Sequence, residues 1–593
     1  MTLSALKSLW VLLFLLVCQS VPAQETSGNQ ESSGTAVISG DFFDSFQLIG
    51  DASEAELERV AVQGQSFTEA WRITGKTQPA NPWDVQLGSS NSLSLNQGDT
   101  LVLRFWARAL SPQARTEFVF EQDGPPWEKS LTAGIILDQT WREVQIPFQT
   151  LRAFAPGQAS ALFRLGYGEQ SFELANFSLE SFANTRAVTD FPTLGFSYHG
   201  READAPWRQE AEKRIDEIRK ADLEIRVVDS QGNPVEGVRL ELDQSRHDFA
   251  FGSAVDAERL FSQDADGERY RQTIDELFNW VVLENDLKWP VWECCRRELA
   301  LKALDYFAER GVKVRGHNLL WPCYEDYCLP QDAANLLNQP EALQARISEH
   351  FSDILSATQG KLVHWDVINE PSANKRLADV YGEDQMAEWF KQVKGLEPHT
   401  QLYLNDYGNL GEGTLDVEFK RIISRMQELG APLEGIGLQG HFGWQLTPPE
   451  ELYERLDSFA QFGLPLMITE FDVTITDEQL QADYLRDFFT IAFSHPAVDG
   501  ILMWGFWEGQ HWMPEAALYR SDWSAKANAH AYQDLVFNTW RTKEAALTDS
   551  TGGYKTRAFL GDYYLRISHN DVLLEQTIHL DKAGQSVIIV VAN

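Results

Sequence analysis

The chain has 593 residues. This is too long for a single hydrophobic core, so we expect two or three domains. It carries 87 acidic and 50 basic residues, which gives a formal charge of −37. So acidic a surface argues against a nucleic acid or an anionic membrane as the partner and suits a neutral one. We expect a monomer.

The first residues predict the compartment. Lys7 precedes an apolar run, Leu9–Val17. The segment Val21-Pro22-Ala23 then ends in small residues, and we expect cleavage after Ala23. The run is too short to span a membrane and is typical of a signal peptide over residues 1–23. The residues before Cys18, Leu16 and Val17, match the lipoprotein signal pattern poorly. We therefore expect secretion.

Residues 24–35 are polar and predict a linker. Residues 36–184 alternate short apolar runs with turns, as in Ser92–Ala109, where an Asn-Gln-Gly-Asp turn separates two strands. Many short strands without a clear helix predict a β-sandwich or jelly roll. Residues 185–222 are expected to form a linker with one exposed helix over 204–220.

Residues 223–245 are expected to form accessory strands; within them, 223–244 have the pattern of a hairpin, with an Asp-Ser-Gln-Gly-Asn-Pro turn between two strands. Residues 546–593 are also rich in predicted strands. We expect the two segments to meet as one small accessory sheet.

Residues 246–545 alternate strands with long amphipathic helices, two of which end at Gly311 and Gly430. Eight strands at this spacing favour a (β/α)₈ barrel. A doubly wound open sheet should have a Gly-rich phosphate loop after its first strand, and 251–260 is not one. The predicted strands are Phe249–Val255, Val281–Leu283, Val312–Leu319, Leu362–Ile368, Gln401–Leu404, Gly435–Leu438, Leu466–Ile468 and Gly500–Met503.

Functional residues of a barrel lie at the carboxyl ends of its strands. Polar groups or Trp follow seven of the eight predicted strands, which packing alone does not explain. Among them, Glu370 and Glu470 are expected to face each other across the barrel mouth. Two carboxyls about 5–5.5 Å apart can cleave an acetal with retention, one protonating the leaving oxygen and the other attacking the anomeric carbon.

The motifs at these strand ends resemble glycoside hydrolase family 10, the retaining endo-β-1,4-xylanases. The predicted hairpin over 223–244 and the tail near RAFLGDYYL (557–565) look most like the plant-type branch of that family. The resemblance covers about 300 residues and implies a (β/α)₈ xylanase; we expect no cofactor. The matching stretches are FNWVVLENDLKW (278–289), VRGHNLLW (314–321), WDVINEP (365–371), LYLNDYG (402–408), GIGLQGH (435–441), ITEFDV (468–473) and, more loosely, MWGFWEGQHWMPE (503–515).

The resemblance implies roles for these residues. Glu370 would be the general acid/base and Glu470 the nucleophile. Asn369 would hydrogen-bond the sugar 2-hydroxyl, and His441 would keep the nucleophile ionised. The other implied substrate contacts are Glu284, Asn285, Lys288, His317, Trp321 and Gln439 on the glycone side, Trp504 and Trp512 around the cleaved sugar, and Tyr407 on the leaving-group side. No metal ligand is expected.

Two loops depart from the family pattern. Pro322 and Cys323 follow Trp321, where the family usually has His, and Cys294 and Cys295 lie in the loop after the second strand. We predict that these two cysteines and the pair Cys323 and Cys328 form disulfides, either between the loops or within each; buried free thiols are the alternative. Because these two loops depart from the family pattern, the preference of the site among xylose chains, glucose chains and decorated chains stays open.

Residues 81–109 are similar to carbohydrate-binding modules of families 4, 9 and 22, which are β-sandwiches. This resemblance implies sugar binding by aromatic side chains. It leaves open whether this domain holds a structural calcium ion. The candidates are Trp71, Trp83, Trp106, Trp127 and Trp141.

Three other functions stay open for the barrel. It could act on β-glucan or mixed chains, or be an inactive barrel that binds polysaccharide. A metal-dependent hydrolase is the third, although His317 and His441 lack a His-x-His pattern or a clustered carboxylate set.

Overall fold

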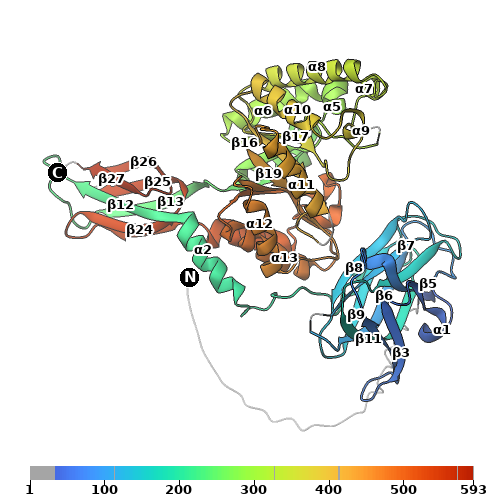
Figure 1. Cartoon of the computed structure of the whole chain (residues 1–593). Coiled ribbons are helices and arrows are strands. Elements are labelled where there is room, and N and C mark those ends of the chain that lie inside the picture. The colour runs from blue at the N-terminus through green and yellow to red at the C-terminus, as the bar shows by residue number, and fades with distance from the viewer. Residues whose placement is uncertain (1–33, 113, 326, 412–414, 571, 592–593) are drawn as a thin grey trace, which may run out of the picture.

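The computed structural model describes residues 34–112, 114–325, 327–411, 415–570 and 572–591. The predicted signal peptide and nearly all of the predicted linker lie outside these ranges. The chain forms a β-sandwich, a barrel and a pair of small sheets, and the strands of the small sheets come from segments before and after the barrel (Figure 1). Within the described ranges, no helix has the length and apolar character that crossing a bilayer requires.

The N-terminal part is a β-sandwich, as predicted. One sheet has the order β3 (Ala55–Ala61), β4 (Glu69–Gly75), β11 (Gln170–Ser181), β6 (Thr100–Ala109) and β9 (Arg142–Gln149), with β1 (Thr35–Ala36) on β11. The other has the order β2 (Gln47–Gly50), β5 (Val85–Ser90), β10 (Ala159–Arg164), β7 (Arg115–Gln122) and β8 (Lys129–Ile136). Alternate residues face inward, so that Phe105 of β6 packs edge-on against Phe163 of β10 across the core.

The barrel has the eight predicted parallel strands. They are β14 (Ala250–Val255), β15 (Trp280–Leu283), β16 (Lys313–Gly316), β17 (His364–Asn369), β18 (Gln401–Asp406), β19 (Gly435–Leu438), β21 (Leu466–Val473) and β22 (Val498–Met503). Pairing of β14 with β22 closes the barrel, and the two-residue β20 (His441–Phe442) extends β21. The strands are almost wholly buried, because helices cover their outer side.

Helices alternate with these strands. They are α3 (Ala257–Phe261), α4 (Ala265–Leu277), α5 (Trp289–Val291), α6 (Arg297–Glu309), α7 (Gln331–Ala334), α8 (Pro340–Thr358), α9 (Ala378–Tyr381), α10 (Gln385–Leu396), α11 (Leu415–Glu428), α12 (Pro449–Ala460), α13 (Glu478–Ser494) and α14 (Ala527–Asp534). Outside the barrel lie α1 (Phe42–Ser45) and the connecting helix α2 (Trp207–Arg219). Gly311 and Gly430 follow α6 and α11 with φ of 63° and 65°, as the helix-end prediction requires.

The accessory strands differ from the prediction, because they form two sheets rather than one. One sheet has the order β24 (Gly553–Phe559), β12 (Lys220–Val228) and β27 (Gln585–Val590). The other has the order β23 (Lys543–Leu547), β13 (Arg239–His247), β25 (Gly561–His569) and β26 (Val572–Leu580). The hairpin predicted over 223–244 is therefore wrong. Both strands bury their alternate apolar residues, such as Ile225 and Leu240, in one shared core, which brings them face to face instead of edge to edge.

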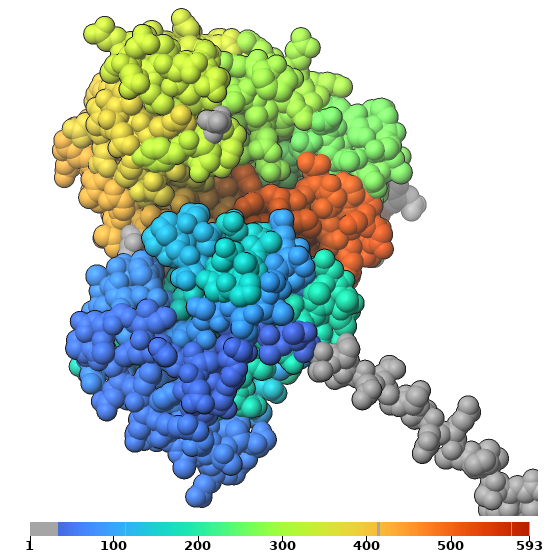
Figure 2. Space-filling model, turned by 90° about the vertical axis from the view of Figure 1, so that its right-hand side faces the viewer, coloured from blue at the N-terminus to red at the C-terminus, as the bar shows by residue number. Residues whose placement is uncertain are grey.

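The β-sandwich packs directly against the barrel (Figure 2). The backbone N–H of Gly134 on β8 donates to the Trp444 carbonyl at 2.8 Å, and the Trp444 ring contacts Phe196 with 5.1 Å between centroids. Gln445 donates to Glu117 on β7. Since Trp444 and Gln445 follow β20 at the barrel mouth, the sandwich borders the end of the barrel where functional residues gather.

Candidate active site

A cleft of about 660 Å³ opens at the carboxyl ends of the barrel strands. All predicted site residues except Asn285 line it: Glu284, Lys288, His317, Trp321, Asn369, Glu370, Tyr407, Gln439, His441, Glu470, Trp504 and Trp512. Asn285 is not among the lining residues, but its Oδ1 accepts a hydrogen bond from Lys288 Nζ at 2.9 Å. The barrel thus brings together residues from seven separate strand ends.

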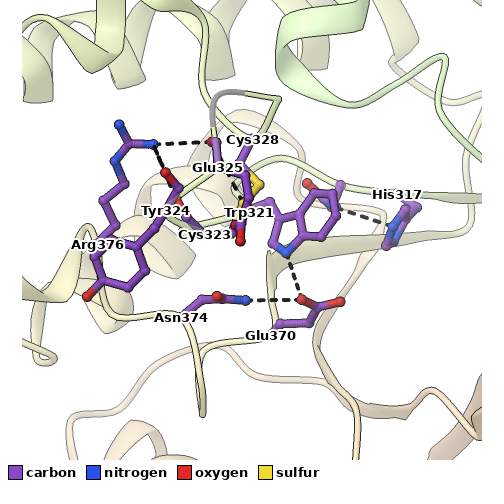
Figure 3. Close-up of a disulfide and its surroundings, with 10 residues drawn as sticks. His317, Trp321, Cys323, Tyr324, Glu325, Cys328, Glu370, Asn374 and Arg376 are labelled. Atoms are coloured by element: carbon purple, nitrogen blue, oxygen red, sulfur yellow. Dashed lines mark hydrogen bonds between the residues drawn. A yellow bond between two sulfur atoms is a disulfide. The ribbon is translucent and has the colours of Figure 1, made fainter. Parts of the chain in front are cut away.

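Glu370 follows β17 in a left-handed backbone conformation with φ of 57°. This conformation costs a non-glycine residue about 1–2 kcal/mol, and such strain persists where surrounding contacts fix it. Its N–H donates to the Asn405 carbonyl at 2.7 Å. Its carboxylate accepts from Trp321 Nε1 at 2.8 Å and from Asn374 Nδ2 at 3.0 Å (Figure 3). The carboxylate is therefore held toward the cleft.

Glu470 lies within β21 and is only 4% exposed. Its Oε1 accepts a hydrogen bond from Asn405 Nδ2 at 2.8 Å, and its Oε2 lies 3.3 Å from His441 Nε2. Burial alone would raise the pKa of Glu470, but the hydrogen bond from His441 and the charges of His441 and His317 outweigh it and lower the pKa. Glu470 is thus an ionised carboxylate that is almost completely shielded from solvent.

His441 lies between two carboxylates. Its Nδ1 forms an ion pair with Asp472 Oδ1 at 2.9 Å, and its Nε2 faces Glu470. Burial alone would lower the pKa of His441, but Asp472 and Glu470 raise it to about 10. The ring is therefore a cation at neutral pH. Sequence reasoning missed Asp472, although the two-residue period of a strand places it on the same face as Glu470.

Three amide side chains join the two glutamates. Gln439 Nε2 donates to Glu370 Oε1 at 3.0 Å and approaches Asn369 Oδ1 at 3.4 Å. Asn405 Nδ2 donates to the same Asn369 oxygen at 2.8 Å and to Glu470. The two carboxylates of the cleft therefore share one hydrogen-bond network built by β17, β18, β19 and β21.

Comparison with known proteins identifies the domain that carries this network. Residues 242–537 match the family model described as glycosyl hydrolase family 10. The barrel of this chain belongs to glycosyl hydrolase family 10.

The relatives are themselves diverse. The chain is 30% identical over 367 residues to an anti-sigma-I factor of Acetivibrio thermocellus, a match covering 61% of this chain and 47% of that protein. It is 28% identical over 390 residues to endo-1,4-beta-xylanase 1 of Arabidopsis thaliana, covering 64% of this chain and 40% of that protein. The chain thus spans about half the length, or less, of these curated relatives.

Among solved structures, xylanase 10B of Thermotoga petrophila RKU-1 in complex with xylobiose is 24% identical to this chain. That comparison has a TM-score of 0.46 and covers 49% of this chain and 95% of the other.

On one side of the family 10 cleft, Lys288 lies near three carboxylates. Burial lowers the pKa of Lys288, while the charges of Glu470, Glu284 and Glu370 oppose that shift. Its ammonium nitrogen is 5.0 Å from the centroid of the Trp321 ring. Burial also raises the pKa of Glu284. A cation and hydrogen-bonding groups placed in this way can hold sugar hydroxyls.

His317 is oriented by a buried ion pair beneath the family 10 site. Its Nδ1 lies 2.9 Å from Asp366 Oδ2, and Arg315 Nε donates to the same oxygen at 3.1 Å. Burial alone would raise the pKa of Asp366, but the Arg315 charge and the His317 hydrogen bond lower it. Sequence reasoning missed Asp366, whose signal is an acid in the middle of an otherwise apolar strand.

Asp406 is a third buried acid that sequence reasoning did not assign. It is fully buried at the end of β18, and it accepts hydrogen bonds from the N–H groups of Ser372 and Tyr407, both at 2.9 Å. Burial raises the pKa of Asp406 to about 7, and the nearby charge of Glu370 adds to the shift. Asp406 thus supports the loop that follows Glu370.

The disulfides form within each loop, which was one of the two predicted arrangements. Cys323 pairs with Cys328 at the rim of the family 10 cleft, and Cys294 pairs with Cys295. Several further residues line the cleft that were not predicted as site residues: Cys323, Glu325, Tyr327, Asn374, Leu410, Phe442 and Gln445.

The tryptophans proposed for the β-sandwich divide into two groups. Trp71 packs against Phe43, and Trp106 and Trp141 pack against Phe67, with 4.9–5.7 Å between ring centroids. Trp83 and Trp127 are 51% and 52% exposed. The other three are partly buried, and the Arg164 guanidinium lies 5.1 Å from the centroid of the Trp83 ring.

A second cavity, of about 830 Å³, lies at the opposite end of the barrel. Its walls include Ala250, Lys313 and Gln401 at the starts of three strands, together with Asp581 and Lys582 of the accessory sheets. It contains none of the predicted site residues.

Proposed function

We propose that this protein is a retaining endo-β-1,4-xylanase. The observation that carries the proposal is the network in which Glu370 and Glu470 line one cleft and share Gln439, Asn369 and Asn405. Membership of family 10 and the relatives that are named endo-1,4-beta-xylanases support xylan as the substrate.

In the proposed first step, Glu470 attacks the anomeric carbon while the bond to the leaving sugar breaks. Glu370 gives its proton to the leaving oxygen, and a glycosyl ester forms on Glu470. In the second step Glu370 takes a proton from water, and that water displaces Glu470. His441 and Asn405 stabilise the Glu470 carboxylate before the attack and after its release, and the chemistry needs no cofactor.

The walls of the cleft suit a neutral sugar chain. Trp504 and Trp512 line it beside His441, and Tyr407 lines it on the side where we place the leaving group. Aromatic faces of this kind stack on pyranose rings, while Lys288 and Gln439 can hydrogen-bond hydroxyls. We also propose that the β-sandwich binds glycan, with Trp83 and Trp127 as its contact residues.

We propose further that the protein is secreted. The signal-peptide pattern of residues 1–23 supports this, as does the pairing of Cys323 with Cys328 and of Cys294 with Cys295. Disulfides of this kind persist in oxidising compartments.

Digestion of purified arabinoxylan, glucuronoxylan and β-glucan tests the proposed activity. We expect shortened xylan chains, and proton NMR at early times should show the β-anomer of the new reducing end. Cleavage of β-glucan alone would favour a glucanase of the same clan. No cleavage of any polymer, with glycan binding retained, would favour a barrel that only binds polysaccharide.

A further inference from the structure

The loop between β16 and α7 places an additional carboxylate in the cleft. Cys323 and Cys328 close this loop, and Glu325 and Tyr327 line the cleft from within it. Glu325 is exposed, and within the described part of the chain its carboxylate forms no ion pair. The stretch that matches the family motif, 314–321, ends just before this loop, at Trp321.

The backbone of the loop is held firmly from the side of the proposed acid/base. Arg376 Nη1 donates to the carbonyls of Cys323, Tyr324 and Glu325, each at 3.3 Å. Tyr324 Oη donates to Asp379 at 2.6 Å. Figure 3 shows Arg376 and the disulfide on either side of this segment, next to Trp321. The Cys323–Cys328 disulfide, the hydrogen bonds from Arg376 and the Tyr324–Asp379 hydrogen bond therefore fix the backbone position of Glu325.

Glu325 lines the cleft together with the rings of Tyr327 and Tyr407. Burial raises the pKa of Tyr327, and the charges of Glu325 and Glu370 raise it further. Burial likewise raises the pKa of Tyr407, and the charges of Glu370 and Glu325 contribute. Tyr327 is 61% exposed and packs against Trp321 with 5.4 Å between ring centroids. Glu325, Tyr327 and Tyr407 thus line the same cleft, in which we place Tyr407 on the leaving-group side of the proposed reaction.

The nearest cation to Glu325 that the hydrogen bonds identify is Arg376, which donates to backbone carbonyls of the loop and, among the described residues, forms no ion pair with the Glu325 carboxylate. Lys288 is held by Asn285 close to Glu284, and His441 lies between Glu470 and Asp472. An acidic group on a bound sugar would meet the exposed Glu325 carboxylate in the cleft, whereas a neutral group could donate a hydroxyl hydrogen bond to it.

We propose that Glu325 is a specificity-determining residue that selects against acidic substituents, such as glucuronosyl groups, on the sugar bound beside Tyr407. This inference rests on the proposed xylanase function and adds a substrate preference to it. Neutral xylan, bare or with neutral branches, is the class of substrate that the loop accepts.

The test compares two xylo-oligosaccharides of equal length, one unsubstituted and one with a single glucuronosyl group. The measured quantity is the ratio of kcat/KM for the acidic substrate to kcat/KM for the neutral one. In Glu325→Gln this ratio should rise about fivefold at low salt and by less at about 0.5 M salt, where exposed charges are screened. Glu349→Gln, an exposed substitution on α8 with the same change in net charge, should leave the ratio as in the wild type.

An unchanged ratio in Glu325→Gln, or an equal rise in Glu349→Gln, would overturn the inference while leaving the xylanase proposal intact. Failure of the wild type to cleave either substrate would overturn the xylanase proposal and this inference with it.

Discussion

Replacement of His441 by Gln tests the electrostatics of the site most sharply. Burial alone would lower the pKa of His441, but Asp472 and Glu470 raise it from 6.5 to about 10. At about 1.4 kcal/mol per pKa unit, this rise corresponds to roughly 5 kcal/mol in favour of the charged ring. If about half of it comes from Glu470, the substitution removes roughly 2 kcal/mol of stabilisation from the ionised nucleophile.

The sign of the effect on rate follows from the lowered pKa of Glu470. Its carboxylate is active above that pKa, so loss of the His441 charge should move the acid limb of kcat/KM upward by about 1.5 pH units. At pH values below the limb the rate should fall about 30-fold. The substrate should be 4-nitrophenyl β-xylobioside, whose leaving group needs no proton, so that the limb reports Glu470 alone. His530→Gln, an exposed substitution on α14, is the control. An acid limb that does not move in His441→Gln would refute this reasoning.

Three further predictions concern other parts of the site. Glu470→Ala should lower kcat roughly 10⁴-fold, with partial recovery on adding azide or formate; full activity would contradict its role. The pKa of Asp406, raised by burial to about 7 from 3.8, makes the folded state bind more protons, so stability should fall by roughly 3 kcal/mol from pH 5 to pH 8. Asp406→Asn should remove that fall in urea unfolding, and an equal fall in the variant would contradict the assignment. The double variant Cys323→Ser, Cys328→Ser should lose roughly 2 kcal/mol of unfolding free energy and raise KM; unchanged values would show that the disulfide does not hold the loop.

The barrel could be predicted from sequence because its signals are local and repeated. Each strand is an apolar run that ends in polar residues, as at Asn369 and Glu370, and helices such as α6 and α11 end at glycines in the left-handed region. The site followed from the rule that functional residues lie at the carboxyl ends of barrel strands. Twelve of the thirteen predicted site residues line one cleft, and only Asn285 does not.

The features that were missed depend on partners far apart in the sequence. Strands β12 and β13 have the pattern of a hairpin, yet each pairs with strands from the C-terminal segment, more than 300 residues away. Asp366 and Asp472 gain their roles from His317 and His441 on other strands. The backbone position of Glu325 depends on Arg376. No local sequence pattern indicates that Arg376 contacts this loop.

Trapping the glycosyl-enzyme tests the central claim most directly. A 2-deoxy-2-fluoro-β-xylobioside with a dinitrophenyl leaving group should inactivate the protein, because fluorine slows hydrolysis of the ester more than it prevents its formation. Peptide mass spectrometry should then find one disaccharide on the peptide that contains Glu470, and none in Glu470→Ala. A label on another residue, or continued turnover of an unlabelled protein that releases the α-anomer from xylan, would contradict the assignment of Glu470 as the nucleophile.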